Sequence, residues 1–159
     1  MDYHKFRSLI ILLLVLTVMS CDRYRVFDQS IDIDEKGWDQ KDAIVLETEI
    51  ADTMTLHKIF VNIRNTTDYS FSNIYLFVKT IFPNGRVARD TLQGILADKE
   101  GKWLGKGIGK IRDNQILIMK DIRFPYQGLY VFEIEQAMRI KILPGIKDVG
   151  LRIEKQSSN

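Results

Sequence analysis

The stretch that decides the fold is Ile74-Tyr75-Leu76-Phe77-Val78-Lys79-Thr80-Ile81-Phe82. In a β-strand successive side chains point to opposite faces, and here both faces are apolar. One face carries Ile74, Leu76, Val78 and Phe82, and the other carries Tyr75, Phe77 and Ile81. A strand that is apolar on both faces is typical of the middle of a sheet. We therefore expect this stretch to lie centrally in a β-domain.

The rest of the chain continues the β pattern, with apolar and polar residues alternating at a period of two. Turn-forming residues separate the alternating segments, as at Phe82-Pro83-Asn84-Gly85 and Pro144-Gly145. Seven or eight short strands with such breaks predict an all-β antiparallel sandwich of jelly-roll or immunoglobulin-like type. The further alternating segments are Ile44 to Ile50, Ile59 to Arg64, Ile116 to Ile122, Tyr130 to Glu135 and Val149 to Glu154.

Helical signals are weak. Asp90 to Lys99 could form one helix with Leu92, Ile95 and Leu96 on a face, although Gly94 disfavours it. A second helical turn is possible at Glu135 to Arg139. We place the sandwich domain at residues 41–155 and expect residues 156–159 to be a frayed tail.

The N-terminus has the layout of a secretory signal. Lys5 and Arg7 precede an aliphatic run over residues 9–18, and Cys21, the one cysteine, follows at once. About ten apolar residues span roughly 15 Å as a helix, half of a bilayer core, so a permanent transmembrane helix is disfavoured. We predict a cleaved lipoprotein signal peptide at residues 1–20 and lipidation of Cys21. The alternative is a free cysteine after an uncleaved anchor or an ordinary signal.

Two or three acyl chains on Cys21 would hold the mature protein permanently on a membrane. We expect residues 21–40 to form the lipidated N-terminus and a solvated tether. The residues after the cysteine, Asp22 to Arg25, are mixed in sign and form no acidic run of the kind that directs surface export in one bacterial group. This favours a location in the cell envelope, on the outer membrane facing the periplasm.

Composition excludes some function classes. The formal net charge is +2, and no block of basic residues is present, so nucleic acid is not an expected partner. Among possible catalytic groups, His57 is the one histidine after the predicted signal, and no Gly-x-Ser-x-Gly elbow exists. We interpret His57 as a polar residue at a strand edge. The sequence predicts no enzyme activity and no cofactor; a hydrolase using Asp90 and Asp98 is a minor alternative.

An acidic cluster at Asp32, Asp34 and Glu35 could suggest calcium, because hard cations prefer oxygen ligands. The spacing matches no standard calcium loop. A solvated segment explains the cluster better, and we predict no metal.

The glycine-rich segment Gly101 to Lys110 is the least expected local feature. It does not match the phosphate-binding loop, so a bulged strand or wide loop is the simpler interpretation. Trp103 within it, and Trp38 near the N-terminus, either pack on the core or stand exposed as contacts for a protein or a glycan.

Several of these motifs occur in an order that resembles the gliding-motility lipoprotein H family (GldH) of the Bacteroidota. The resemblance implies a non-enzymatic envelope lipoprotein that acts with other gliding or secretion proteins near the type IX secretion machinery. It carries over only the lipidation of Cys21. The runner-up hypothesis is a glycan-binding lipoprotein. The motifs are Cys21, Phe82 to Gly85, Leu96 to Asp98, Gly101 to Gly107, Glu135 to Arg139 and Asp148 to Glu154.

Overall fold

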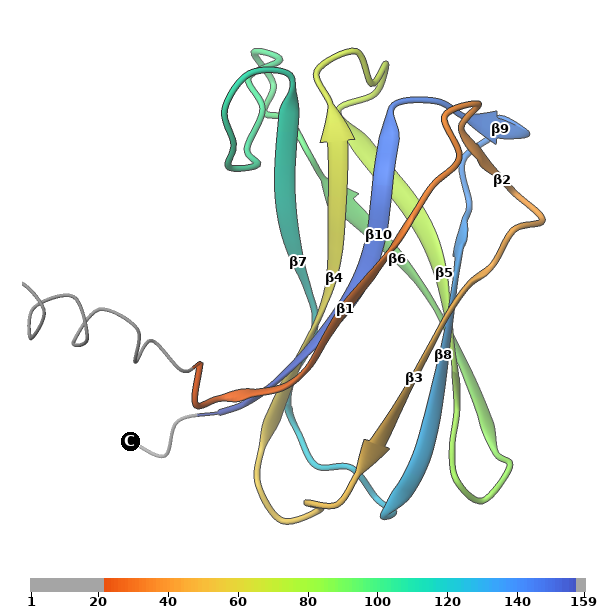
Figure 1. Cartoon of the computed structure of the whole chain (residues 1–159), viewed down its shortest axis with the longest axis vertical. Coiled ribbons are helices and arrows are strands. Elements are labelled where there is room, and N and C mark those ends of the chain that lie inside the picture. The colour runs from red at the N-terminus through yellow and green to blue at the C-terminus, as the bar shows by residue number, and fades with distance from the viewer. Residues whose placement is uncertain (1–21, 157–159) are drawn as a thin grey trace, which may run out of the picture.

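Two four-stranded antiparallel sheets pack face to face in the computed structural model, which describes residues 22–156 (Figure 1). The predicted all-β sandwich is confirmed. The first sheet has the order β1 (Arg25–Asp32), β10 (Ile146–Lys155), β4 (His57–Thr66) and β7 (Ile111–Ile122). The second has the order β3 (Ile44–Ile50), β8 (Gly128–Gln136), β5 (Asn73–Ile81) and β6 (Val87–Ile95). A small additional sheet pairs β2 (Trp38–Asp39) with β9 (Ile142–Leu143).

The strand pairing distinguishes between the two predicted kinds of sandwich. β1 pairs with β10, β3 with β8, β4 with β7 and β5 with β6, so the pairs are nested along the chain. Nested pairs arise when one long antiparallel hairpin folds over into two sheets, which is the jelly-roll order. In an immunoglobulin domain the first and last strands belong to different sheets. The fold is therefore a jelly roll.

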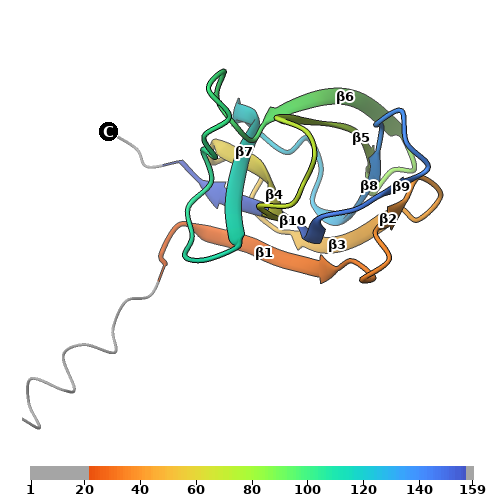
Figure 2. The same ribbon diagram turned by 90° about the horizontal axis from the view of Figure 1, so that it is seen from above.

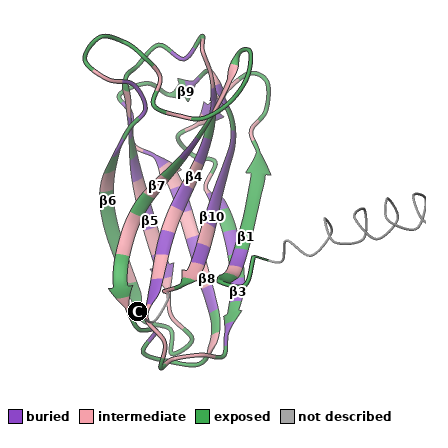
Figure 3. Ribbon diagram, turned by 90° about the vertical axis from the view of Figure 1, so that its left-hand side faces the viewer, coloured by how far each residue is buried: buried purple, intermediate pink, exposed green. Residues whose placement is uncertain are grey.

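The buried core lies between the two sheets and comes from alternate strand positions, which appear as purple bands in Figure 3. β5 lies between β8 and β6, in the centre of the second sheet, as expected. Its inward residues are buried, but Tyr75 on its outer face is 40 % exposed. Among residues 22–156 no third layer covers this face, and Arg89 from β6 instead lies over the ring of Phe77, 4.6 Å from its centroid.

The helix suggested for Asp90 to Lys99 is not present; residues up to Ile95 form β6. β6 pairs with β5 along its whole length, from Ile81 opposite Val87 to Asn73 opposite Ile95. Gly94 is buried, and a Cβ there would lie 2.3 Å from Ile116 Cδ1. The glycine that disfavoured a helix thus allows close packing between the two sheets.

Residues 25–32 and 38–39, assigned above to a tether, instead form β1 and β2. β1 is an edge strand whose pairing with β10 runs from Arg25 opposite Glu154 to Asp32 opposite Asp148. It also contributes Phe27 to the core. Its polar composition follows from its position, because an edge strand with one face in water needs few apolar residues.

The two ends of the sandwich differ in the segments that they present (Figure 1), and Figure 2 shows the sandwich end-on. We call the end where β1 begins and β10 ends the anchor end; it carries the β3–β4 and β7–β8 loops. The opposite, distal end carries the long connection from β6 to β7. The predicted signal peptide and Cys21 lie outside the described residues. Within residues 22–156, the structure contains no helix with the length and apolarity needed to cross a bilayer.

His57 begins β4, as a strand-edge position would suggest, but it is buried at 1 % exposure. Its ring meets the edge of Phe124 with centroids 5.1 Å apart, and its Nδ1 has no hydrogen-bond partner. Burial lowers the pKa of His57, although the nearby Asp52 carboxylate acts in the opposite direction. The histidine is therefore a core residue that favours the neutral form.

We expect His57→Phe to reduce the loss of stability on acidification. A histidine whose pKa is lower in the folded state binds protons preferentially when unfolded, so stability falls as the pH drops through the unfolded value near 6.5. Phenylalanine keeps the packing on Phe124 and cannot titrate. Urea unfolding at pH 7 and pH 5 measures the effect. An unchanged difference between the two pH values would show that His57 is not responsible.

Candidate functional site

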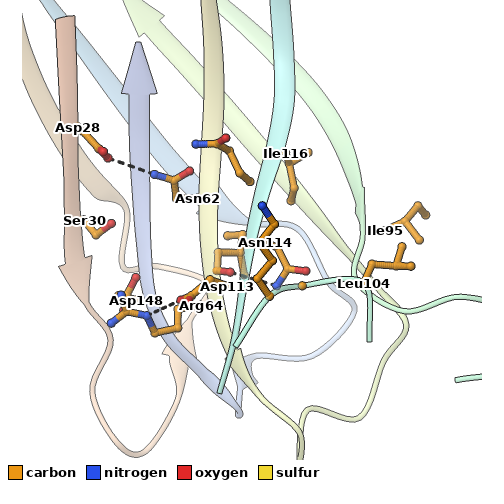
Figure 4. A pocket seen from close by; sticks show the side chains of 14 residues that line it. Asp28, Ser30, Asn62, Arg64, Ile95, Leu104, Asp113, Asn114, Ile116 and Asp148 are labelled. Atoms are coloured by element: carbon orange, nitrogen blue, oxygen red, sulfur yellow. Dashed lines mark hydrogen bonds and ion pairs between the residues drawn. The ribbon is translucent and has the colours of Figure 1, made fainter. Parts of the chain in front are cut away.

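A polar groove crosses the outer face of the first sheet in its distal half (Figure 4). Its volume is about 720 Å³, and residues 104–106 of the β6–β7 connection form one wall. Gly150 lies opposite Ser30 on this face and adds no side chain to it. We call this hollow the outer groove; its polar lining includes Asp28, Ser30, Asn62, Arg64, Asp113 and Asp148.

The charges in the outer groove largely compensate one another. Arg64 Nε donates to Asp113 Oδ1 at 2.8 Å, and its Nη1 lies 3.0 Å from Asp148 Oδ2. Burial raises the pKa of Asp148, while Arg64 opposes that shift. The hydrogen bond to Asp113 in turn raises the pKa of Arg64. The groove therefore offers paired charges and hydrogen-bonding groups, an arrangement suited to polar contacts.

The described residues 22–156 contain no group of three His, Cys, Asp or Glu side chains placed to hold a metal ion. Within the acidic cluster that suggested calcium, Asp34 Oδ1 accepts a hydrogen bond from the backbone N–H of Lys36 at 2.8 Å. Asp98, one of the two carboxylates considered for a hydrolase, is likewise used locally: its Oδ1 accepts from the N–H groups of Glu100 and Lys102.

The β6–β7 connection, residues 96–110, is the second feature of the distal end, and we call it the distal loop. It begins with a small hairpin in which Ala97 pairs with Trp103 across a turn braced by Asp98. It then runs along β7, where Lys106 and Asp113 exchange backbone hydrogen bonds of 2.9 and 2.7 Å. Both contacts tie the loop to the sandwich.

Two glycines explain why the distal loop can lie so close to β7. A Cβ at Gly105 would meet the side chain of Asn114 at 2.7 Å, and one at Gly107 would meet the Ile111 carbonyl oxygen at 2.3 Å. Gly107 also has a φ of +147°, which favours glycine. Beneath Gly105, the buried Asn114 donates to Asn65 Oδ1 at 2.8 Å. The glycine-rich segment is thus a wide loop with a defined shape.

Apolar side chains stand exposed on this shaped loop. Ile108 is 97 % exposed, and Leu104 is 56 % exposed next to Ile95 at the rim of the outer groove. The loop also carries four lysines against two acidic residues. Exposed apolar residues on a fixed loop are typical of an interaction site.

The structure places the residues that the sequence singled out as follows. Trp38 is 1 % exposed, and its Nε1 donates to the Asp42 carbonyl at 2.7 Å, so it is a core residue. Trp103 is partly buried against the core, near Tyr69. Neither tryptophan lines the outer groove. Cys21 lies outside the described residues.

Sequence reasoning missed the outer groove. Arg64, Asp113 and Asp148 come from three strands far apart in the chain, and nothing in their local sequence marks them as neighbours. One signal was available: Gly150 interrupts an alternating strand, and glycine inside a strand often marks the close approach of another segment.

Comparison with known proteins identifies relatives along nearly the whole chain. The family described as GldH lipoprotein matches residues 25–153. A gliding motility lipoprotein GldH homolog of Christiangramia forsetii is 34 % identical over 160 residues, covering 96 % of this chain and 98 % of that protein. The gliding motility lipoprotein GldH of Flavobacterium johnsoniae is 31 % identical over 154 residues, covering 92 % and 95 %.

Among solved structures, a chain of the infectious bursal disease virus Gx strain aligns with a TM-score of 0.41 and 13 % identity, covering 87 % of this chain and 34 % of the viral one. The VP2 subviral particle of the same virus aligns with a TM-score of 0.34 and 14 % identity, covering 84 % of this chain and 31 % of the viral one. The family match and the two bacterial relatives together show that this chain belongs to the GldH lipoprotein family.

Proposed function

We propose that this protein is a non-enzymatic scaffold or assembly component of the gliding motility machinery associated with type IX secretion. The GldH family is a family of lipoproteins, so the protein is a lipid-anchored protein of the cell envelope. The family is not a known enzyme family. In this proposal acyl chains on Cys21 hold it in the outer membrane, facing the periplasm. Its partners are other gliding or secretion proteins of the envelope.

The observation that carries the proposal is Ile108 at the tip of the distal loop. It is 97 % exposed, although the loop around it is held by backbone bonds and shaped by glycines. The ten residues of β4 span about 30 Å, so the distal loop stands about that far from the anchor end. A protein anchored at one end would thus present this loop away from the membrane.

The chemistry of the distal loop indicates what kind of surface it fits. Ile108 and Leu104 would fill an apolar recess, and Lys102 and Lys106 would favour a partner with acidic residues beside that recess, whereas Lys110 already pairs with Asp68. Interfaces of this kind combine an apolar centre with a polar rim.

Cross-linking in intact cells tests the proposal. The lipidated protein would be recovered from gently solubilised envelopes and its cross-linked partners identified by mass spectrometry. We expect gliding or secretion proteins with the native chain and a severalfold loss with Ile108→Asp. Val87→Asp is the matched control, because Val87 is 56 % exposed but lies at the start of β6, toward the anchor end.

Cys21→Ala serves as the unanchored control in the same experiment. Recovery of no envelope protein with the native chain, together with normal gliding and secretion after deletion, would contradict the scaffold role. Equal losses of cross-linked partners with Ile108→Asp and Val87→Asp would show that the distal loop has no specific part in the scaffold role.

The glycan-binding alternative has less support. It relied on exposed tryptophans for stacking against sugar rings, whereas Trp38 is buried and Trp103 packs partly against the core. The polar outer groove is the feature that favours it. Bound polysaccharide recovered in place of protein partners would revive this alternative.

A further inference from the structure

Arg152 gathers three carboxylates at the anchor end of the first sheet. It lies on β10 with a side chain 15 % exposed, and it forms ion pairs with Asp22, with Asp28 on β1 at 2.5 Å and with Glu154 at 2.6 Å. The hydrogen bond from Arg152 lowers the pKa of Asp22, so this carboxylate stays charged. A guanidinium shared by three carboxylates holds them in a defined geometry.

The partner Asp22 is the important one, because it follows Cys21 directly in the chain. Two backbone bonds hold the same segment: Arg25 N–H donates to the Asp22 carbonyl at 3.2 Å, and Lys155 N–H donates to the Tyr24 carbonyl at 2.7 Å. Consecutive Cα atoms are 3.8 Å apart. A lipid on Cys21 would therefore be attached to the folded domain with no free tether between them.

The surface next to this attachment point is suited to a lipid headgroup layer. Tyr24 is 47 % exposed, and Met54 at the tip of the β3–β4 loop is 79 % exposed. Arg23 and Arg123 are exposed at the same end. Amphipathic aromatic rings favour the membrane interface, and arginines favour anionic headgroups.

Contacts between segments make this end one continuous surface. Arg123 Nε donates to the Met54 carbonyl at 2.8 Å, which ties the β7–β8 loop to the β3–β4 loop. Lys155 Nζ lies 2.9 Å from Asp52 Oδ2, which ties the end of β10 to the β3–β4 loop. The parts of this surface would approach a membrane together.

We propose that the anchor end lies directly on the lipid surface, fixed there through the Arg152–Asp22 ion pair, with Tyr24 and Met54 at the headgroup layer. This inference rests on the proposed lipidation of Cys21. It deepens the proposed function, because a domain docked in one orientation holds its distal loop at a set height above the membrane.

Spin-label accessibility tests the docking. The mature chain has one cysteine, which the lipid would block, so Met54→Cys supplies a unique thiol for a nitroxide in the full lipidated protein. Ile108→Cys is the matched control at the distal end. In vesicles of phosphatidylethanolamine mixed with phosphatidylglycerol, we expect the label at position 54 to be severalfold less accessible to a water-soluble relaxation agent than the label at position 108. Equal accessibility at both positions overturns the docking.

Asp22→Asn tests the role of the Arg152–Asp22 ion pair. It weakens this ion pair and leaves Arg152 bound to Asp28 and Glu154, which preserves the fold. We expect it to raise the accessibility at position 54 severalfold while the protein stays on the vesicles; no change overturns the role of the ion pair. Co-sedimentation with the vesicles separates the two proposals. If the chain fails to sediment, both the lipid anchor and the docking are overturned. If it sediments but position 54 is fully accessible, only the docking is overturned.

Discussion

Replacing Tyr130 by alanine is expected to lower the free energy of unfolding by about 3–5 kcal/mol, the usual cost of removing a large aromatic side chain from a core. Tyr130 is 0 % exposed near the start of β8. Its ring packs edge-on against Phe82 and Phe124, with centroids 5.6 and 5.0 Å away, and stacks on Phe132 at 6.4 Å. Alanine would leave a cavity where these three rings now meet.

The control for this prediction is Tyr130→Phe, which keeps the ring and removes only the hydroxyl. That hydroxyl donates to the Tyr126 carbonyl at 3.0 Å and accepts from the Tyr126 N–H at 3.2 Å, so its loss should cost about 1 kcal/mol. Urea unfolding of the mature domain gives both values. Similar losses for the two variants would mean that the hydroxyl, and not the ring packing, holds the cluster.

Replacing Gly150 by valine is expected to displace β1 from the first sheet and to cost about 3 kcal/mol, the upper end of the usual range for overpacking. A Cβ at position 150 would lie 2.1 Å from Ser30 Oγ and 2.5 Å from the Gln29 carbonyl oxygen. The second contact is with backbone, so a rotamer change cannot relieve it. β1 must move away from β10, and the ion pair between Arg152 and Asp28 is lost with it.

Hydrogen exchange of the β1 amides measures this displacement, and urea unfolding measures the cost. The double variant Gly150→Val with Ser30→Gly removes the contact with the serine hydroxyl but leaves the contact with Gln29, so it should recover only part of the stability. Unchanged protection of the β1 amides in Gly150→Val would contradict the account of the close approach.

The strands were predictable because their signal is local. Alternation at a period of two identified the stretches that became β3, β4, β8 and β10, and the doubly apolar stretch became the central β5. The helix suggested at Asp90 to Lys99 was wrong because pairing with β5 decides the structure of this segment: Ile95 is exposed at the end of β6, and Leu96 is buried only after the strand ends. Residues 25–32 looked like a solvated tether because an edge strand in contact with water carries little apolar signal.

The candidate site was less predictable than the fold. The glycine-rich segment was recognised as a wide loop, but the reason for its glycines is the close approach of Asn114 and the Ile111 carbonyl, which belong to the next strand. The outer groove was not foreseen at all. Its charged residues, Arg64, Asp113 and Asp148, meet only when three strands pair in a particular register.

The sequence by itself determined the class of this protein. Its strand periodicity indicated an all-β sandwich, and the order of its motifs along the chain indicated membership in a lipoprotein family. Only the tertiary structure decided that the sandwich is a jelly roll, that β1 belongs to it, and that Asp22 is clamped by Arg152 from the other end of the chain. The physical reason is the distance along the sequence between the residues that interact. Strand periodicity and turn chemistry depend on neighbouring residues, whereas strand order, grooves and ion pairs depend on contacts between residues far apart in sequence, which no local pattern encodes.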